Sequence, residues 1–110
     1  MSAIPKIVKI RMGHDRTYVK LLLKNVGKSE LPEGTVEIKL TYRDRTVQRD
    51  SIFNYTPLAP DESTWMTIST ASVNSNAKKM EGVGYNLPND GKLELNFVCH
   101  RKFFAWWLTN

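Results

Sequence analysis

The chain has 110 residues, enough for one domain of ordinary size, and its 16 Lys and Arg outnumber its 11 Asp and Glu, giving a net charge of +5. No apolar stretch reaches the roughly 18 residues of a membrane-spanning helix, and residues 1–6 lack the apolar core of a secretory signal. Cys99 is the one cysteine, which excludes the intramolecular disulfides of many small secreted domains. We therefore expect a single domain, residues 1–110, in the cytoplasm or nucleus or in a virion. In that setting the sequon Asn54-Tyr55-Thr56 is a chance occurrence.

Apolar and polar residues alternate with a period of two along most of the chain, which indicates half-buried antiparallel strands. We expect seven strands, at residues 7–12, 17–24, 35–42, 46–53, 64–70, 80–86 and 93–99. In the first strand the inward set would be Val8, Ile10 and Met12. The residues expected to share one core are Val36, Ile38, Leu40, Leu93, Leu95 and Phe97.

Turn chemistry separates these strands. Proline, glycine and asparagine gather at residues 25–34, 57–61 and 88–91, and Arg43-Asp44-Arg45 is expected at the tip of a tight hairpin. Gly82 and Gly84 indicate a bulge within the sixth strand. Because no window of ten residues carries a convincing helical stripe, the chain is predicted to be all-β. The expected fold is an antiparallel β-sandwich, immunoglobulin-like or jelly-roll.

Several of these turns resemble those of immunoglobulin-like modules of the CARDB type. In that family an Asn-x-Gly sequence ends the second strand, and a Leu-x-Pro-Gly-Glu-Ser turn opens the fifth. The run 19–27 ends in Asn25-Val26-Gly27, the turn 31–34 follows, and residues 58–63 read Leu-Ala-Pro-Asp-Glu-Ser, with Asp61 where the family prefers Gly. The likeness covers residues 17–70. It implies the sandwich fold and a binding role, and it identifies no site.

The sequence gives no indication of catalysis, of a metal or of a cofactor. His14 and His100 are the only histidines, and Cys99 and His100 are neighbours on an expected strand, where their side chains point to opposite faces. No serine sits in a Gly-x-Ser-x-Gly elbow, and residues 14–16 are simplest as a solvated turn. We expect Cys99 in the core and His100 on the surface, in a protein that is not an enzyme.

The basic residues have two interpretations. Arg43, Arg45 and Arg49 cluster around one hairpin, and further cations lie in the first third of the chain at Lys6, Lys9, Arg11, Arg16, Lys20 and Lys24. They could contact the phosphates of a nucleic acid, or they could form solvated faces and charged edges that prevent aggregation. The aromatic residues among the early cations are few, with Tyr18 and Tyr42 as the candidates, which favours the second interpretation.

The C-terminal segment concentrates five large apolar residues within six positions: Phe103, Phe104, Trp106, Trp107 and Leu108. They could complete the core, bind a second subunit or partner protein, or form an exposed platform for sugars or bases. At least three of the five are expected to be buried, either in the domain itself or against another chain, because five such groups in solvent would forgo burial energy comparable to the stability of a small domain.

Trp65 is expected to be a pillar of the core, with Phe53, Met66 and Ile68 as its neighbours.

Three functions are consistent with this pattern. The first is a non-catalytic binding or structural module that makes protein contacts, most simply a homo-oligomer that associates through an edge strand and the C-terminal aromatics. The second is a nucleic-acid-binding protein that uses the basic strands and the hairpin of Arg43, Arg45 and Arg49. The third is a carbohydrate-binding module with Trp106 or Trp107 as its stacking face.

Overall fold

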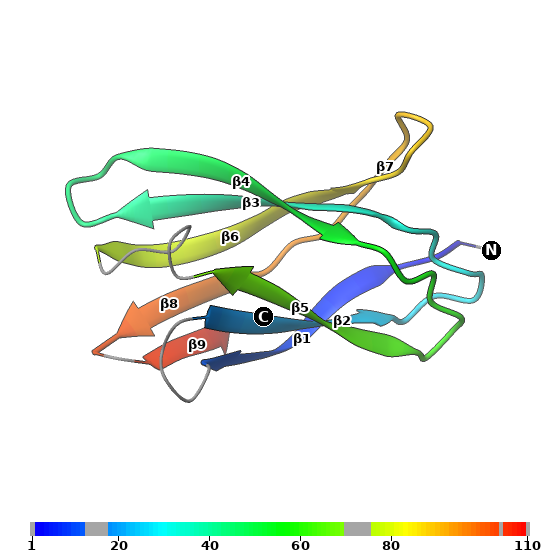
Figure 1. Cartoon of the computed structure of the whole chain (residues 1–110), viewed down its shortest axis with the longest axis horizontal. Helices are drawn as coiled ribbons and strands as arrows, with labels where there is room; N and C mark the ends of the chain where they lie inside the picture. Colours follow the sequence, from blue (N-terminus) through cyan, green and yellow to red (C-terminus); the bar gives the residue numbers. More distant parts are fainter. Residues whose placement is uncertain (1, 13–17, 70–75, 104, 110) are drawn as a thin grey trace.

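A computed structural model describes residues 2–12, 18–69, 76–103 and 105–109 of the protein. These residues form nine β-strands and no helix (Figure 1). The strands are β1 (Pro5–Met12), β2 (Tyr18–Asn25), β3 (Gly34–Tyr42), β4 (Val47–Asn54), β5 (Ser63–Ser69), β6 (Ala77–Asn86), β7 (Lys92–Leu93), β8 (Val98–Lys102) and β9 (Ala105–Thr109).

The strands build two antiparallel sheets that pack as a sandwich, which confirms the expected fold class. The small sheet has the order β1-β2-β5, and the large sheet has the order β4-β3-β6-β8-β9, with the two-residue β7 paired to β6. The chain changes sheet between β2 and β3, between β4 and β5, and between β5 and β6. The β3–β4 and β8–β9 hairpins both turn at the same end of the sandwich, at the left of Figure 1.

The core lies between the inner faces of the sheets, and strict alternation fills it. In β3 every second residue is buried, and Val36, Ile38 and Leu40 have no exposed surface. Leu95 and Phe97 are also buried, as expected, whereas Leu93 is half-buried. The largest fully buried side chains are Tyr85, Ile7, Leu21, Leu23, Leu31, Ile38, Leu40, Met80 and Leu95.

The strand expected at residues 93–99 is divided in the structure. Residues 94–97 belong to no regular strand, although Leu95 and Phe97 fill the core. The backbone N–H of Gly82 donates a hydrogen bond of 2.9 Å to the Phe97 carbonyl, and a Cβ atom on Gly82 would lie 2.4 Å from the Phe97 ring. The missing side chain at Gly82 thus makes room for this ring, and the β3–β6 register shifts next to it, as the expected bulge requires.

A second bulge changes the inward set of β1. Ile7 pairs with Leu23 and Lys9 pairs with Leu22, so Val8 is an extra residue without a partner in the register. The expected inward set of Val8, Ile10 and Met12 is therefore wrong at its first member, because the extra residue puts Ile7 on the same face as Ile10.

The turns that resemble the CARDB type are held by hydrogen bonds of the buried Asn25 side chain. The Asn25 side-chain amide donates to the carbonyls of Ser29 (2.8 Å) and Leu58 (2.9 Å), and its oxygen accepts from the N–H of Gly27 (3.0 Å). Asp61 donates its own N–H to the Asn25 carbonyl and has a φ of 71°, the left-handed conformation in which glycine costs least. These residues therefore have structural roles at the junction between β2 and β5.

Replacement of Ile38 by Ala should lower the free energy of unfolding by about 2–5 kcal/mol, because Ile38 has no exposed surface and its loss leaves a cavity. Urea unfolding would measure this change. Val47→Ala is the matched control on the neighbouring strand, where the side chain is 52% exposed and truncation should cost well under about 1 kcal/mol. Equal losses in the two variants would contradict the assigned register.

Candidate functional site

The described residues contain no group of three or more His, Cys, Asp and Glu side chains that could hold a metal ion. Cys99 is buried and His100 is exposed, so these neighbours face opposite sides of the sheet as expected. Residues 14–16 lie outside the described part of the chain. Burial raises the pKa of the Cys99 thiol to about 12, which keeps it protonated and unreactive at neutral pH.

The C-terminal aromatics lie on a β8–β9 hairpin at one edge of the large sheet, and they have different environments. Trp106 is 7% exposed and belongs to the core, and Leu108 packs against the core while half-buried. Trp107 is 61% exposed and Phe103, in the turn, is 81% exposed, whereas Phe104 lies outside the described residues. The expectation that at least three of the five are buried, in the core or against another chain, therefore stays a prediction. Among the four side chains that the structure describes, the core buries Trp106 fully and Leu108 in part, and Trp107 lies in solvent. The reason is alternation along β9, which puts Trp106 and Leu108 inward and Trp107 outward.

Phe103 also has an unfavourable backbone conformation. Its φ is 58°, in the left-handed region that glycine and asparagine tolerate and that a bulky residue rarely adopts. The hairpin thus holds an aromatic side chain in solvent on a strained backbone, and such outliers often mark functional positions.

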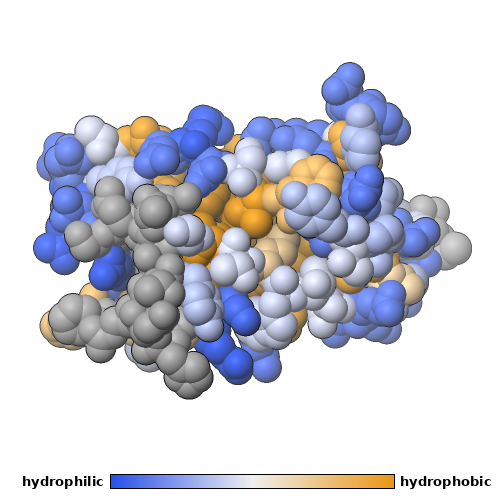
Figure 2. Space-filling view, viewed as in Figure 1, coloured by the Kyte–Doolittle hydropathy of each residue, from blue (hydrophilic) through white to orange (hydrophobic). Residues whose placement is uncertain are grey.

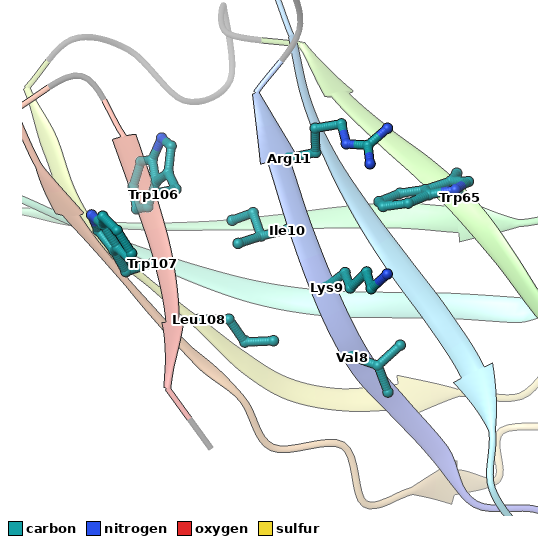
Figure 3. A pocket seen from close by; sticks show the side chains of 8 residues that line it. All are labelled: Val8, Lys9, Ile10, Arg11, Trp65, Trp106, Trp107 and Leu108. Carbon is teal, nitrogen blue, oxygen red and sulfur yellow. The ribbon is translucent and has the colours of Figure 1, made fainter.

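A groove of about 440 Å³ runs along the seam where edge strands β1 and β9 approach each other. In Figure 3, Ile10 and Leu108 extend into the space between these strands, while Trp107 points to the other side of β9. The groove is lined by Val8, Lys9, Ile10, Arg11, Trp65, Trp106, Trp107 and Leu108.

Trp65 is not a core pillar, and that prediction is wrong. It is 38% exposed on the outer face of the small sheet, because Met66 and Ile68 take the inward positions of β5. The Arg11 guanidinium lies over its indole ring (Figure 3), and the distance from the guanidinium carbon to the ring centroid is 5.3 Å. Phe53, expected beside it in the core, is 43% exposed on β4.

The outer face of the small sheet is basic. Its three strands contain five Lys and Arg residues and not one Asp or Glu. The register places Lys6 opposite Lys24 and Arg11 opposite Lys20, and Lys9, Leu22 and Trp65 form one row across the sheet. Sequence reasoning missed this face because Trp65 is distant in sequence from the cations that it joins.

The basic hairpin has its expected form. The Tyr42 N–H donates to the Thr46 carbonyl (2.9 Å), which closes the turn, and Arg43, Arg45 and Arg49 are all exposed. Asp44 lies between two of the arginines, and hydrogen bonds from the Thr46 hydroxyl and N–H lower the pKa of its carboxyl group. The turn therefore carries a negative charge next to its positive ones, and its net positive charge is small.

A second seam lies between β4 and β5, where Figure 2 shows apolar residues at the centre of the face. The rings of Phe53 and Tyr55 are in contact there, tilted by 42° with centroids 4.4 Å apart, and Tyr55 is 77% exposed. Next to them, the sequon residue Asn54 is buried, and its amide donates to the Thr56 carbonyl and to the Tyr85 hydroxyl. In the folded domain this amide is not available as a glycosylation acceptor, in agreement with the chance interpretation.

Comparison of the chain with protein-family models, with curated protein sequences and with solved structures gave no match.

Among the residues that the structure describes, no helix is long and apolar enough to cross a membrane.

The two adjacent tryptophans should respond differently to truncation. Trp106→Ala should lower the free energy of unfolding by about 3–5 kcal/mol, whereas Trp107→Ala should change it by less than about 1 kcal/mol, since only Trp106 is buried. Thermal and urea unfolding at protein concentrations low enough to exclude association would measure both. A larger loss for Trp107 would reverse the assignment of the two faces of β9.

Cys99 should make stability depend on pH above pH 9. The pKa of the thiol is about 12 in the folded chain against an ordinary value of 9.0, so the unfolded chain ionises first and stability falls as the pH rises from 9 toward 12. The stability advantage of the natural protein over Cys99→Ala should therefore shrink by about 1.4 kcal/mol between pH 8 and pH 10. Urea unfolding at the two pH values measures it, and a constant difference would show an accessible thiol.

Proposed function

We propose that this domain is a non-catalytic interaction module that self-associates through its β8–β9 hairpin. The observation that carries the proposal is the pair of aromatic side chains, Phe103 and Trp107, that the hairpin leaves in solvent. Trp and Phe are typical anchors of protein interfaces, where their large apolar surfaces are removed from water.

The position of the hairpin supports the same function. β9 is the last strand of the large sheet, so one of its sides has no partner strand within that sheet. Its sequence, Ala-Trp-Trp-Leu-Thr, lacks the charged residues and prolines that commonly protect such edges from other chains. A second copy that paired with this edge would cover Trp107 and extend the hydrogen bonding of the sheet.

Phe103 supports the proposal by its conformation. A left-handed φ and an exposed fraction of 81% are both unfavourable for the isolated domain. Asparagine or glycine would adopt the conformation of this turn at a lower free-energy cost. Folding therefore gives no reason for a phenylalanine at this position, whereas a contact between its phenyl ring and a second chain does.

The strand order supports an immunoglobulin-like relationship as part of this proposal. In constant-type immunoglobulin domains the first, second, fourth and fifth strands share one sheet, and the third, sixth and seventh form the other. The order β1-β2-β5 against β4-β3-β6-β8 agrees with this for the first, second, third, fifth and sixth strands and departs from it at β4, which pairs with β3 in the large sheet. The turns at Asn25 and Asp61 agree with the CARDB-type resemblance, which implies a binding role.

The arrangement gives less support to a carbohydrate module. Trp106 is in the core, so Trp106 and Trp107 do not form a joint platform for a sugar ring.

Self-association is tested by sedimentation velocity over a range of protein concentrations. The natural chain should be an oligomer, and Trp107→Ser should weaken association by at least about tenfold, as expected for an interface tryptophan. Phe103→Asn should also weaken association, while its melting temperature stays equal or rises because Asn tolerates the left-handed conformation.

Tyr55→Ser is the matched control, since it removes another exposed aromatic side chain from the seam between β4 and β5. It should leave the oligomer intact. A chain that sediments as a monomer at every concentration would contradict the proposal, and dissociation by Tyr55→Ser alone would move the interface to the other seam.

A further inference from the structure

The outer face of the small sheet has a charge distribution that folding alone does not explain. All five of its charged residues are cations, contributed by β1 and β2. In the register, Lys6 lies opposite Lys24 and Arg11 opposite Lys20. Like charges directly opposite each other in a sheet are destabilising, so this arrangement lowers the stability of the free domain. Such violations of local rules are typical of functional surfaces.

The rest of the molecule does not share this pattern. The large sheet mixes the two signs, and its ion pairs join Lys79 to Glu81 (3.3 Å) and Lys92 to Glu37 (3.7 Å). The small sheet offers its cations no carboxylate from its own strands. The positive field above it is therefore available to an anionic ligand.

Aromatic side chains stand among these cations. Arg11 lies over the Trp65 ring and Lys20 lies near the Tyr18 ring, each 5.3 Å from the ring centroid. Trp65 is 38% exposed, and the groove at the β1–β9 seam brings Lys9 and Arg11 next to its ring. A face that combines aromatic rings with cations can hold a chain of phosphates and stack its bases, which are the two interactions that bind single-stranded nucleic acids.

We propose that the outer face of the small sheet binds single-stranded nucleic acid, with Lys6, Lys9, Arg11, Lys20 and Lys24 contacting phosphates and Trp65 stacking on a base. The six residues belong to β1, β2 and β5 and none to the β8–β9 hairpin, which adjoins this face at the β1–β9 groove, and the proposal does not depend on self-association. Single strands fit better than a duplex because the bases of a duplex are already stacked on each other and cannot reach Trp65. A neutral sugar is a poorer match because it would leave the five cations without a counter-charge.

The first test is binding of the full chain to labelled oligothymidine and oligouridine, measured by fluorescence anisotropy at several salt concentrations. Log affinity should fall with log salt with a slope no steeper than about −3.5, the value for five phosphate contacts on a single strand. The variant Lys9→Gln, Arg11→Gln, Lys20→Gln should bind at least about tenfold more weakly, with a slope about two units shallower.

A charge-matched control separates this face from a general effect of net charge. The variant Lys28→Gln, Lys39→Gln, Lys78→Gln removes three cations that lie outside the small sheet's strands, and it should retain most of the affinity. Equal losses in the two triple variants would overturn the proposal. If affinity fell only in a variant with Arg43, Arg45 and Arg49 replaced, the proposal would also be overturned, and the ligand would be placed on the large sheet.

Trp65 provides a direct readout. In the Trp107→Phe background, Trp65 is the one exposed tryptophan of the described residues. Oligonucleotide should therefore quench the tryptophan fluorescence of this variant. Trp65→Ala should weaken binding about fivefold or more, since stacking on one base contributes about 1–3 kcal/mol. Unchanged affinity in Trp65→Ala, or tighter binding to a duplex of the same length, would overturn the stacking arrangement.

Lys20→Glu distinguishes lost binding from lost folding. It gives Arg11 an oppositely charged neighbour, so the melting temperature should stay equal or rise while oligonucleotide affinity falls. A fall in both would overturn the place of Lys20 in the proposed site and give it a role in the fold. Anionic phosphatidylglycerol vesicles serve as the second ligand, and binding to vesicles without binding to oligonucleotides would overturn the proposal in favour of a membrane surface.

Discussion

The structure depends on one constraint: each strand has two faces, and a two-layer sandwich buries only one of them. Register therefore decides the environment of every side chain, and a shift by one residue exchanges the faces. The bulge at Val8 shows this exchange directly, because Ile7 before it and Ile10 after it both face the core although they are an odd number of positions, three, apart in the sequence. The same constraint buries Trp106 and leaves Trp107 in solvent, one position further along β9.

Much of the fold could be predicted from the sequence because its strands alternate clearly. The all-β class, the hairpin of residues 43–45, the bulge near Gly82 and the core positions of β3 are all present in the structure. The exceptions have physical causes. The segment 94–97 alternates like a strand, but Phe97 packs against Gly82 and these residues belong to no regular strand. Trp65 is expected inside because a tryptophan on a central strand of a sandwich is often a core pillar, yet its place in β5 is set by its neighbours Met66 and Ile68.

The candidate surfaces were harder to predict from the sequence than the fold. The C-terminal aromatics could be found because they are consecutive, but their division between core and solvent requires the register of β9. The basic face of the small sheet joins β1 and β2 to β5, which follows only after two further strands in the other sheet. A search for aromatic residues among the early cations finds Tyr18 and misses Trp65, since proximity along the chain is a poor guide to proximity across a sheet.

The uncharged edge of β9 has a consequence for the size of any assembly that it forms. If β9 pairs antiparallel with β9 of a second copy, the contact has two-fold symmetry and each copy uses its edge completely, so growth stops at two. If β9 instead met the β4 edge at the opposite side of the same sheet, every added copy would present a fresh edge, and a fibre would result. The β4 edge carries Arg49 and Asp50, whereas β9 carries no charge. This difference in charge disfavours the open-ended contact and favours the closed pair.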